Sequence, residues 1–243
     1  MEQEVKKVIA WVKEYVEETN AKGVVIGNSG GKDSATVIAI AVKAIGKENV
    51  LAIAMPCLSK ESDLEDAKLV ADTFGVEMIT VDLTETYVAL ENRIQHSLQK
   101  EISIDSKINM KPRLRMTTLY SIAQTLGYLV IGTGNLSEAI VGYTTKWGDS
   151  SYDFNPIAKF TMEEVKEIGK ILGVPNKIIE KAPSDGLGEQ TDEEKMEILY
   201  SQISEYINTG KTEEVAMERI KELNKKSAHK RNSIPVYPYR RGN

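Results

Sequence analysis

The chain has 243 residues, of which 28% are charged and 41% hydrophobic, so it is long enough to bury a sizeable core. Its net charge of −5 argues against a general nucleic-acid-binding protein, and no apolar stretch approaches the roughly 20 residues that span a bilayer. The single cysteine, Cys57, excludes an internal disulfide and a zinc site built on thiolates. The acidic start of the chain, Met1 to Glu4, is unlike a signal peptide. We therefore expect a cytoplasmic protein that binds neither nucleic acid nor membrane.

Helical and strand patterns alternate along the first two-thirds of the chain. Apolar residues at helical spacing predict an opening helix over 2–19, and short β-branched runs predict buried strands. The expected strands are 23–27, 50–54, 76–81 and 128–131; the expected helices are 35–42, 61–74, 84–98 and 112–126, with a loop over 99–111 and further helices over 161–172, 191–207 and 212–226. This order predicts an α/β fold with a doubly wound, mostly parallel sheet, helices on both faces and a helical C-terminal third. We expect a single domain over residues 1–243.

The turn after the first expected strand has the composition of an anion-binding loop. It reads Ser29-Gly30-Gly31-Lys32-Asp33-Ser34 and leads directly into an Ala-rich helix. Glycines at a strand-to-helix turn expose backbone N–H groups beside the positive end of the helix dipole, where phosphate can bind. The run is not a Walker A loop, but it resembles the S-G-G-x-D-S loop of the ATP pyrophosphatases. That resemblance implies that ATP phosphates bind at Gly27, Asn28, Ser29, Gly30, Gly31, Lys32, Asp33 and Ser34.

A second polar segment, Gly132 to Glu138, follows the fourth expected strand. Because parallel strands end at the same edge of a sheet, this segment and the 27–34 loop can face one ligand. Glu138 has two interpretations. Asn135 and Glu138 have the spacing of a helix capping box, whereas Asp33 and Glu138 could be the two carboxylates that hold Mg²⁺ for ATP chemistry.

Further motifs resemble the NAD synthetases. The run Val141 to Asp149, with Asp153 and Asn155-Pro156 behind it, is similar to the family block G-[YF]-x-T-K-x-G-D…D-x-x-P. Other matching blocks are Lys111 to Met116, Lys181 to Leu187 and His229 to Arg231. The blocks stand in family order from residue 27 to residue 231. The resemblance implies an ammonia-dependent NAD synthetase of the ATP pyrophosphatase superfamily, with an adenine nucleotide alpha hydrolase-like fold.

The resemblance also implies roles for individual residues. ATP would contact Thr133 and Ser184, and Asp33 and Glu138 would hold Mg²⁺. Asp149 would be the catalytic residue, close to the point where ammonia attacks. The residues expected to bind the second substrate, nicotinate adenine dinucleotide (deamido-NAD), are Arg113, Lys146, Asp153, His229 and Lys230.

Two positions depart from the family pattern. Ser184 stands where the family has a threonine and keeps the hydroxyl, whereas the change at Met162 is larger. Many members have a lysine that reaches the ATP phosphates where this chain has Met162. We expect Lys159 or Lys32 to replace it, with a slight preference for Lys159, assisted by the start of the helix that Thr161 caps.

The implied reaction accounts for the need for ATP. A nicotinate carboxylate is a poor electrophile, so AMP is first transferred to it with release of pyrophosphate, and ammonia then displaces AMP to give NAD. Because only about one helix precedes the ATP loop, we expect free ammonia to be used, not a fused glutaminase domain. The family resemblance further implies a homodimer.

Two other functions share part of the pattern. A tRNA-modifying ATP pyrophosphatase would have the same loop, but the acidic balance of the chain and the lack of a basic RNA-binding domain count against it. A non-catalytic adenine-nucleotide-binding module would not require Glu138, Lys146 or Asp149.

Overall fold

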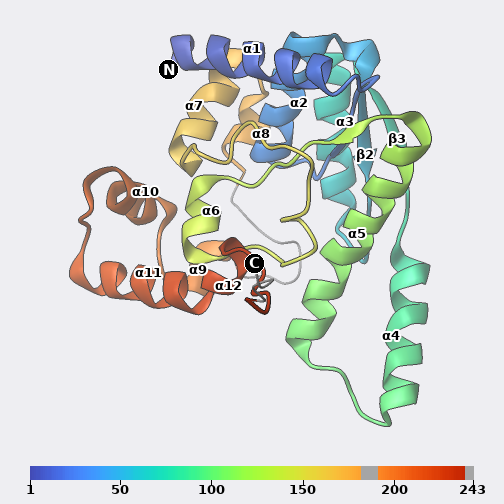
Figure 1. Ribbon diagram of the computed structural model, residues 1–243, viewed down its shortest axis with the longest axis vertical. Coiled ribbons are helices and arrows are strands. Elements are labelled where there is room, and N and C mark those ends of the chain that lie inside the picture. The colour runs from blue at the N-terminus through green and yellow to red at the C-terminus, as the bar shows by residue number, and fades with distance from the viewer. Residues whose placement is uncertain (182–190, 239–243) are drawn as a thin grey trace, which may run out of the picture.

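The computed structural model describes residues 1–181 and 191–238 (Figure 1). The strands are β1 (Val24–Gly27), β2 (Val50–Ala54), β3 (Glu77–Thr80) and β4 (Leu129–Val130). The helices are α1 (Glu2–Glu18), α2 (Lys32–Ile45), the 3-10 turn η1 (Lys47–Asn49), α3 (Glu61–Phe74), α4 (Thr84–Leu98), α5 (Ile104–Leu126), α6 (Leu136–Val141), α7 (Met162–Leu172), α8 (Asn176–Ile179), α9 (Asp192–Met196), α10 (Tyr200–Thr209), α11 (Glu214–Lys226) and α12 (Ala228–Arg231). None of the described helices has both the length and the apolar character of a membrane span.

The strands form a parallel sheet in the order β3-β2-β1-β4. The chain moves outward from β1 to β2 and β3, and it then crosses to the other side of β1 to form β4. This reversal creates a switch point between the carboxyl ends of β1 and β4, which is where open α/β sheets bind ligands. The short β4 is continued by an isolated parallel bridge between Ile131 and Phe154.

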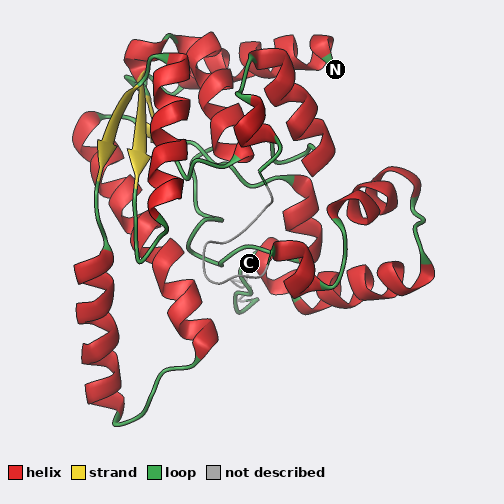
Figure 2. Cartoon of the chain, turned by 180° about the vertical axis from the view of Figure 1, so that it is seen from behind, coloured by secondary structure: helices red, strands yellow, loops and turns green. Residues whose placement is uncertain are grey.

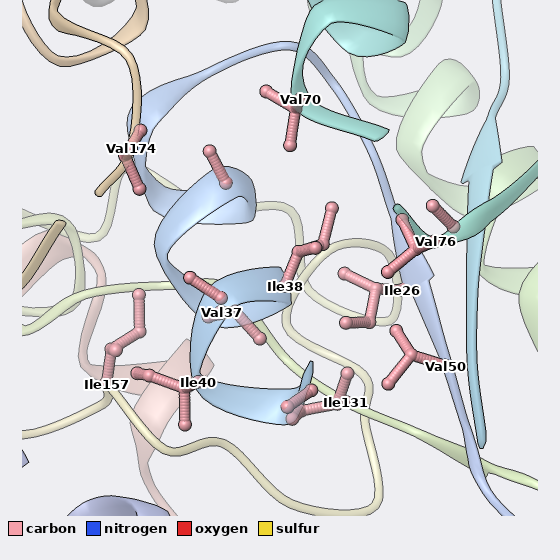
Figure 3. Close-up of a cluster of buried hydrophobic side chains, with 14 of the residues drawn as sticks. Ile26, Val37, Ile38, Ile40, Val50, Val70, Val76, Ile131, Ile157 and Val174 are labelled. Carbon is pink, nitrogen blue, oxygen red and sulfur yellow. The ribbon is translucent and has the colours of Figure 1, made fainter. Parts of the chain in front are cut away.

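The two faces of the sheet bury alternate residues of each strand. In β1, Val24 and Ile26 pack with α1, α2 and α7, whereas Val25 packs with α4 and α5 on the other face. Figure 3 shows Ile38 of α2 against Ile26 in the first of these cores. Helices therefore cover both faces of the sheet (Figures 1 and 2), which confirms the expected doubly wound fold.

Helices α4 and α5 extend past the sheet side by side (Figures 1 and 2). The expected loop over 99–111 is wrong in its second half, because α5 begins at Ile104 and continues through Pro112. The Ser103 hydroxyl caps the helix by accepting a hydrogen bond from the Ser106 N–H at 3.2 Å. The first turns of α5 are tied to α4 by an ion pair of 2.8 Å between Lys107 and Glu91 and not by the sheet. They lack the apolar period of a core helix for that reason.

The expected helix over 191–207 is also wrong, since the structure divides it into α9 and α10. Glu197 has a left-handed φ of 60° and ends α9. A carboxylate oxygen of Glu193 then accepts a hydrogen bond from the Tyr200 N–H at 2.8 Å and stabilises the start of α10. The break lets both Met196 and Ile198 enter a third core, which α6, α7, α10 and α11 share.

Candidate active site

Helix α2 begins at the loop that follows β1, and its N-terminus has no side-chain cap. Inside the loop, the Ser29 hydroxyl lies 3.2 Å from that of Ser34 and accepts a hydrogen bond from the Gly31 N–H at 3.3 Å. Helices α6 and α7, by contrast, are both closed by capping boxes. Of these three helices, α2 is therefore the one whose first backbone N–H groups can bind an anion.

Helix α3 supports this loop from the side of β2. Gly30 has a left-handed φ of 70°, and a Cβ there would lie 2.7 Å from the Asp63 carbonyl oxygen, so only glycine fits. Asn28 is 3% exposed and donates a hydrogen bond to the Ala67 carbonyl at 2.8 Å. Its Oδ1 accepts from the Gly30 N–H at 3.2 Å. The Asn28 side chain therefore shapes the loop, and its contact with ATP stays a prediction.

Asn135 brings the two expected metal-binding carboxylates together. Its side-chain amide donates to Asp33 Oδ1 at 3.0 Å, while its Oδ1 accepts from the Glu138 N–H at 3.0 Å. Glu138 Oε2 accepts in turn from the Asn135 N–H at 2.9 Å, which completes the capping box. The cap uses one oxygen of Glu138 and holds its carboxylate at the edge where Asp33 lies. The two interpretations of Glu138 are therefore compatible.

The charge environment of this pair suits a divalent cation. Removal from bulk water, followed by the negative charge of Asp33, raises the pKa of Glu138 well above its usual range. A cation beside the two carboxylates would offset this repulsion, and Mg²⁺ commonly takes one or two carboxylates and completes its shell with phosphate and water oxygens. The described residues contain no group of three or more His, Cys, Asp or Glu side chains that could hold a metal. Asp33 and Glu138 would therefore supply two ligands, and phosphate oxygens of ATP and water would supply the others, which fits Mg²⁺ bound together with ATP.

The structure favours Lys32 over Lys159 as the cation that replaces the lysine missing at Met162. Lys32 is 4% exposed, and its Nζ lies 3.7 Å from Asp33 Oδ2. Lys159 is exposed and lies with Trp11 beside α1. The Met162 side chain is buried in the third core, and its N–H donates to the Ser137 hydroxyl at 3.0 Å. The start of α7 is therefore already occupied, so the slight preference for Lys159 and for the α7 dipole is not supported.

The run 142–149 lies between α5 and α12 and collects several of the expected substrate-binding residues. Both Nε and Nη2 of Arg113 donate to the Lys146 carbonyl at 3.3 Å. The Thr145 hydroxyl donates to Asn109 Oδ1 at 2.7 Å, which ties the run to α5 a second time. From the other side, the Lys146 ammonium donates to the His229 carbonyl at 2.8 Å. Arg113, Lys146 and His229 thus meet at one loop.

Lys230 anchors α12 to the same run. Its ammonium donates to the carbonyls of Gly142 at 2.7 Å and Thr144 at 2.6 Å. Burial lowers the pKa of Lys230, and the nearby charge of Asp149 opposes that shift. Lys230 is consequently held by the protein chain, and its predicted contact with deamido-NAD is untested.

Asp149 lies at the end of this run, within electrostatic reach of Lys230 and Arg115. Its Oδ1 accepts a hydrogen bond from the Thr145 N–H at 2.7 Å. The residue is accessible to solvent, but protein atoms crowd its carboxyl group. This crowding raises the pKa of Asp149, whereas the hydrogen bond and the two cations oppose the shift. An accessible carboxylate with a raised pKa suits proton transfer.

Three expected residues remain: Asp153, Thr133 and Ser184. Asp153 holds the edge of the sheet, since its Oδ2 accepts from the Val130 N–H at 2.7 Å and its Oδ1 from the Tyr120 hydroxyl at 3.3 Å. Thr133 lies on the loop between β4 and α6 and is partly buried. Ser184 lies outside the described residues.

Arg115 is a further site residue that the motifs did not single out. It extends from α5 to the carboxyl end of β2, where its Nε donates to the Met55 carbonyl at 3.1 Å. Burial lowers the pKa of Arg115, while the charges of Asp149 and Asp63 oppose this change. The signal in the sequence is the matching block Lys111 to Met116, which contains both arginines but does not say which of the two points inward.

Comparison with known proteins identifies the family of the chain. The family model described as NAD synthase matches residues 4–234. The chain belongs to the NAD synthase family. One relative, described as an NH3-dependent NAD+ synthetase from Carboxydothermus hydrogenoformans, is 44% identical over 238 residues, which cover 98% of this chain and 97% of the relative.

Two proteins with solved structures are similar to this chain over nearly its whole length. The NMN synthetase of Francisella tularensis aligns with a TM-score of 0.92 at 33% identity and covers 98% of both chains. The NH3-dependent NAD synthetase of Campylobacter jejuni, in complex with nitrate, aligns with a TM-score of 0.79 at 27% identity and covers 97% of this chain and 98% of its own.

Proposed function

We propose that Asp33, Glu138 and Asp149 are the centre of an ammonia-dependent NAD synthetase site. As a member of the family, the chain is a ligase that converts deamido-NAD to NAD with ammonia and ATP. The observation that carries the site assignment is the Asn135 bridge, which joins the carboxylates of Asp33 and Glu138 beside the uncapped start of α2.

In the first step, the nicotinate carboxylate is activated. One of its oxygens attacks the α-phosphorus of ATP, the bond from that phosphorus to the bridging oxygen breaks, and pyrophosphate leaves. Asp33 and Glu138 would hold Mg²⁺, which neutralises charge on the phosphates when it is bound. The N–H groups at the start of α2 and the buried ammonium of Lys32 stabilise the departing pyrophosphate.

In the second step, ammonia attacks the carbonyl carbon of the adenylated nicotinate and AMP leaves. Asp149 attracts ammonium by its charge and accepts a proton from it, and its raised pKa makes it a stronger base than an ordinary aspartate. Arg115 lies within electrostatic reach of Asp149 and is available to balance the negative charge of AMP.

Deamido-NAD would bind along the run 142–149 and α12. Arg113, Lys146, His229 and Lys230 are already gathered there, and the positive charges of Arg113 and the two lysines attract a substrate with two phosphates. We include Asp153, Thr133 and Ser184 in the proposed substrate and ATP contacts on the strength of the family resemblance.

We further propose that the protein is a cytoplasmic homodimer. The support for a dimer, besides the resemblance, is a set of exposed apolar side chains on the α4–α5 pair: Val88, Leu90, Leu98 and Ile104. Burial of these side chains against a second copy of the chain would remove their apolar area from water.

The activity is tested by incubating the purified chain with ATP, Mg²⁺, ammonium and deamido-NAD while NAD, AMP and pyrophosphate are measured. We expect the three products in equal amounts, and we expect little NAD when glutamine replaces ammonium. AMP release without NAD, or NAD formation from glutamine at the same rate, would contradict the proposal.

A second candidate product is nicotinamide mononucleotide. The observation that favours testing it is the close structural match to the Francisella tularensis protein, which is described as an NMN synthetase. The reacting carboxylate is the same in nicotinate mononucleotide, which lacks only the AMP half of deamido-NAD. The ratio of kcat/KM for the two substrates decides between them, and we expect deamido-NAD to be preferred.

A further inference from the structure

Tyr200 is a buried residue with an unused hydroxyl group. It is the first residue of α10 and is 2% exposed. Its ring packs in the third core with Val141 and Met162, but its hydroxyl oxygen has no hydrogen-bond partner among the described residues. Because a buried hydroxyl without a partner is unfavourable, such groups in native proteins usually serve a ligand or an ordered water.

The hydroxyl is within electrostatic reach of the two bridged carboxylates. Tyr200 packs beside α6, which carries Glu138. Burial, followed by the negative charges of Glu138, Asp192 and Asp33, raises the pKa of Tyr200 far above its usual value. Tyr200 therefore stays protonated at neutral pH and can donate a hydrogen bond.

Three carboxylates around Tyr200 each already use one oxygen in a contact within the protein. Asp192 Oδ1 accepts the hydroxyl of Tyr143 at 2.9 Å. Glu193 uses a carboxylate oxygen to accept from the backbone N–H of Tyr200 itself. Glu138 Oε2 accepts from the Asn135 N–H in the capping box. Among the described residues none of these oxygens accepts the Tyr200 hydroxyl, so this donor is available to a ligand with oxygen atoms.

We propose that the Tyr200 hydroxyl donates a hydrogen bond to an oxygen of the Mg²⁺–ATP complex that Asp33 and Glu138 hold. This inference rests on the proposed function, since it takes Mg²⁺–ATP to be the ligand at these carboxylates. The acceptor is an oxygen of a phosphate or of a water that belongs to the complex. Tyr200 thereby adds a contact from α10 to a site otherwise built from α2 and α6.

The test uses Tyr200→Phe, which keeps the ring in the core and removes only the hydroxyl. Thermal unfolding is measured without ligand, and binding of Mg²⁺ with α,β-methylene ATP is measured by calorimetry, since this analogue cannot transfer AMP. We expect a midpoint without ligand that equals or exceeds that of the unmodified protein. We expect the dissociation constant to rise about tenfold, the effect of one hydrogen bond to a charged partner.

The matched control is Tyr206→Phe, on the same helix and packed on the same core. It should bind the analogue as the unmodified protein does. A lower unfolding midpoint of Tyr200→Phe without ligand would mean that the hydroxyl already has a partner, and an unchanged dissociation constant would mean that it does not contact the complex. Either result overturns the inference. Failure of the unmodified protein to bind the analogue would instead contradict the proposed function.

Discussion

At the scale of single residues, Glu138 closes the first turn of α6 and faces Asp33 with the same carboxylate. A capping glutamate usually lies in water, where its charge is stabilised. Here protein surrounds it and the charge of Asp33 adds to its cost, so the pKa of Glu138 is raised. Capping alone does not explain a carboxylate in such a place, because a glutamine would cap equally well without the charge.

Glu138→Gln separates the two roles. The variant should keep the capping box, so its unfolding midpoint should lie within about 3 °C of the unmodified value or above it. Turnover should fall about 100-fold or more, because a metal-binding carboxylate is lost. Thermal unfolding and a steady-state assay of AMP and NAD release provide both readouts.

Helix α7 offers the control for this variant. Glu164 forms the same kind of capping box with Thr161, so Glu164→Gln makes the same chemical change at a second cap. It should alter neither stability nor turnover appreciably. Equal turnover of the Glu138 and Glu164 variants would assign Glu138 to capping alone.

At the scale of elements, α3 connects the 27–34 loop to the end of the described segment at Lys181. Gly30 packs against α3, and the Lys181 ammonium donates to Asp63 at 2.9 Å and to Asp66 at 2.7 Å. Lys177 adds a second ion pair to Asp66 at 2.7 Å. Burial alone would raise the pKa of Asp66, but the hydrogen bonds from Lys177 and Lys181 outweigh it and hold this pKa below the usual value.

The lowered pKa of Asp66 predicts acid sensitivity. A group whose pKa is depressed by folding stabilises the protein above its unfolded pKa, about 3.9 for aspartate, and this stability is lost as the pH falls through the folded value. Asp66→Asn should lower the free energy of unfolding at neutral pH by about 1–3 kcal/mol. It should also flatten the decline of stability below about pH 4. Denaturant unfolding over a pH series measures both, with Asp72→Asn on the exposed side of α3 as the control.

A second prediction at this scale concerns α12. The two carbonyl contacts of Lys230 hold this short helix against the run 142–149. Lys230→Ala should release it and raise the KM for deamido-NAD about tenfold, the effect of a lost charged hydrogen bond. The KM for ATP should change less than about twofold, because the ATP loop lies on other elements. The control is Lys225→Ala, on the exposed face of α11, which should change neither KM value. Equal effects of Lys230→Ala on both KM values would exclude a selective role of Lys230 in binding deamido-NAD.

At the scale of the whole molecule, the α4–α5 pair carries exposed apolar residues near its tip, including Leu98 and Ile104 (Figure 1). We expect a molar mass of about twice the 27.0 kDa of the chain by light scattering after size-exclusion chromatography. Leu98→Glu combined with Ile104→Glu should shift the mass toward that of one chain, since charges are unfavourable in an apolar interface. The control Val215→Glu replaces an equally exposed apolar residue of α11 and should leave the molar mass unchanged. A monomer before any substitution would contradict the proposed dimer.

The sequence by itself determined the sheet and the edge at which the site lies. Strands β1 and β2 are buried on both faces, so their apolar runs are continuous and visible without any knowledge of the fold. Glycine and serine at the turn after β1 are equally local signals. Alternation of strands and helices then places the loops that carry Asp33 and Glu138 at one edge, and the Asn135 bridge confirms that they meet. That the whole chain is one domain stays a prediction.

Tertiary structure alone decided where the less regular helices begin and which side chains reach the site. The start of α5 at Ile104 depends on an ion pair with α4, and the break at Glu197 depends on the shared burial of Met196 and Ile198. The same break starts α10 at Tyr200, whose ring packs in the core that α6 shares. Such contacts join residues distant in the chain, and local propensity and period contain no information about them.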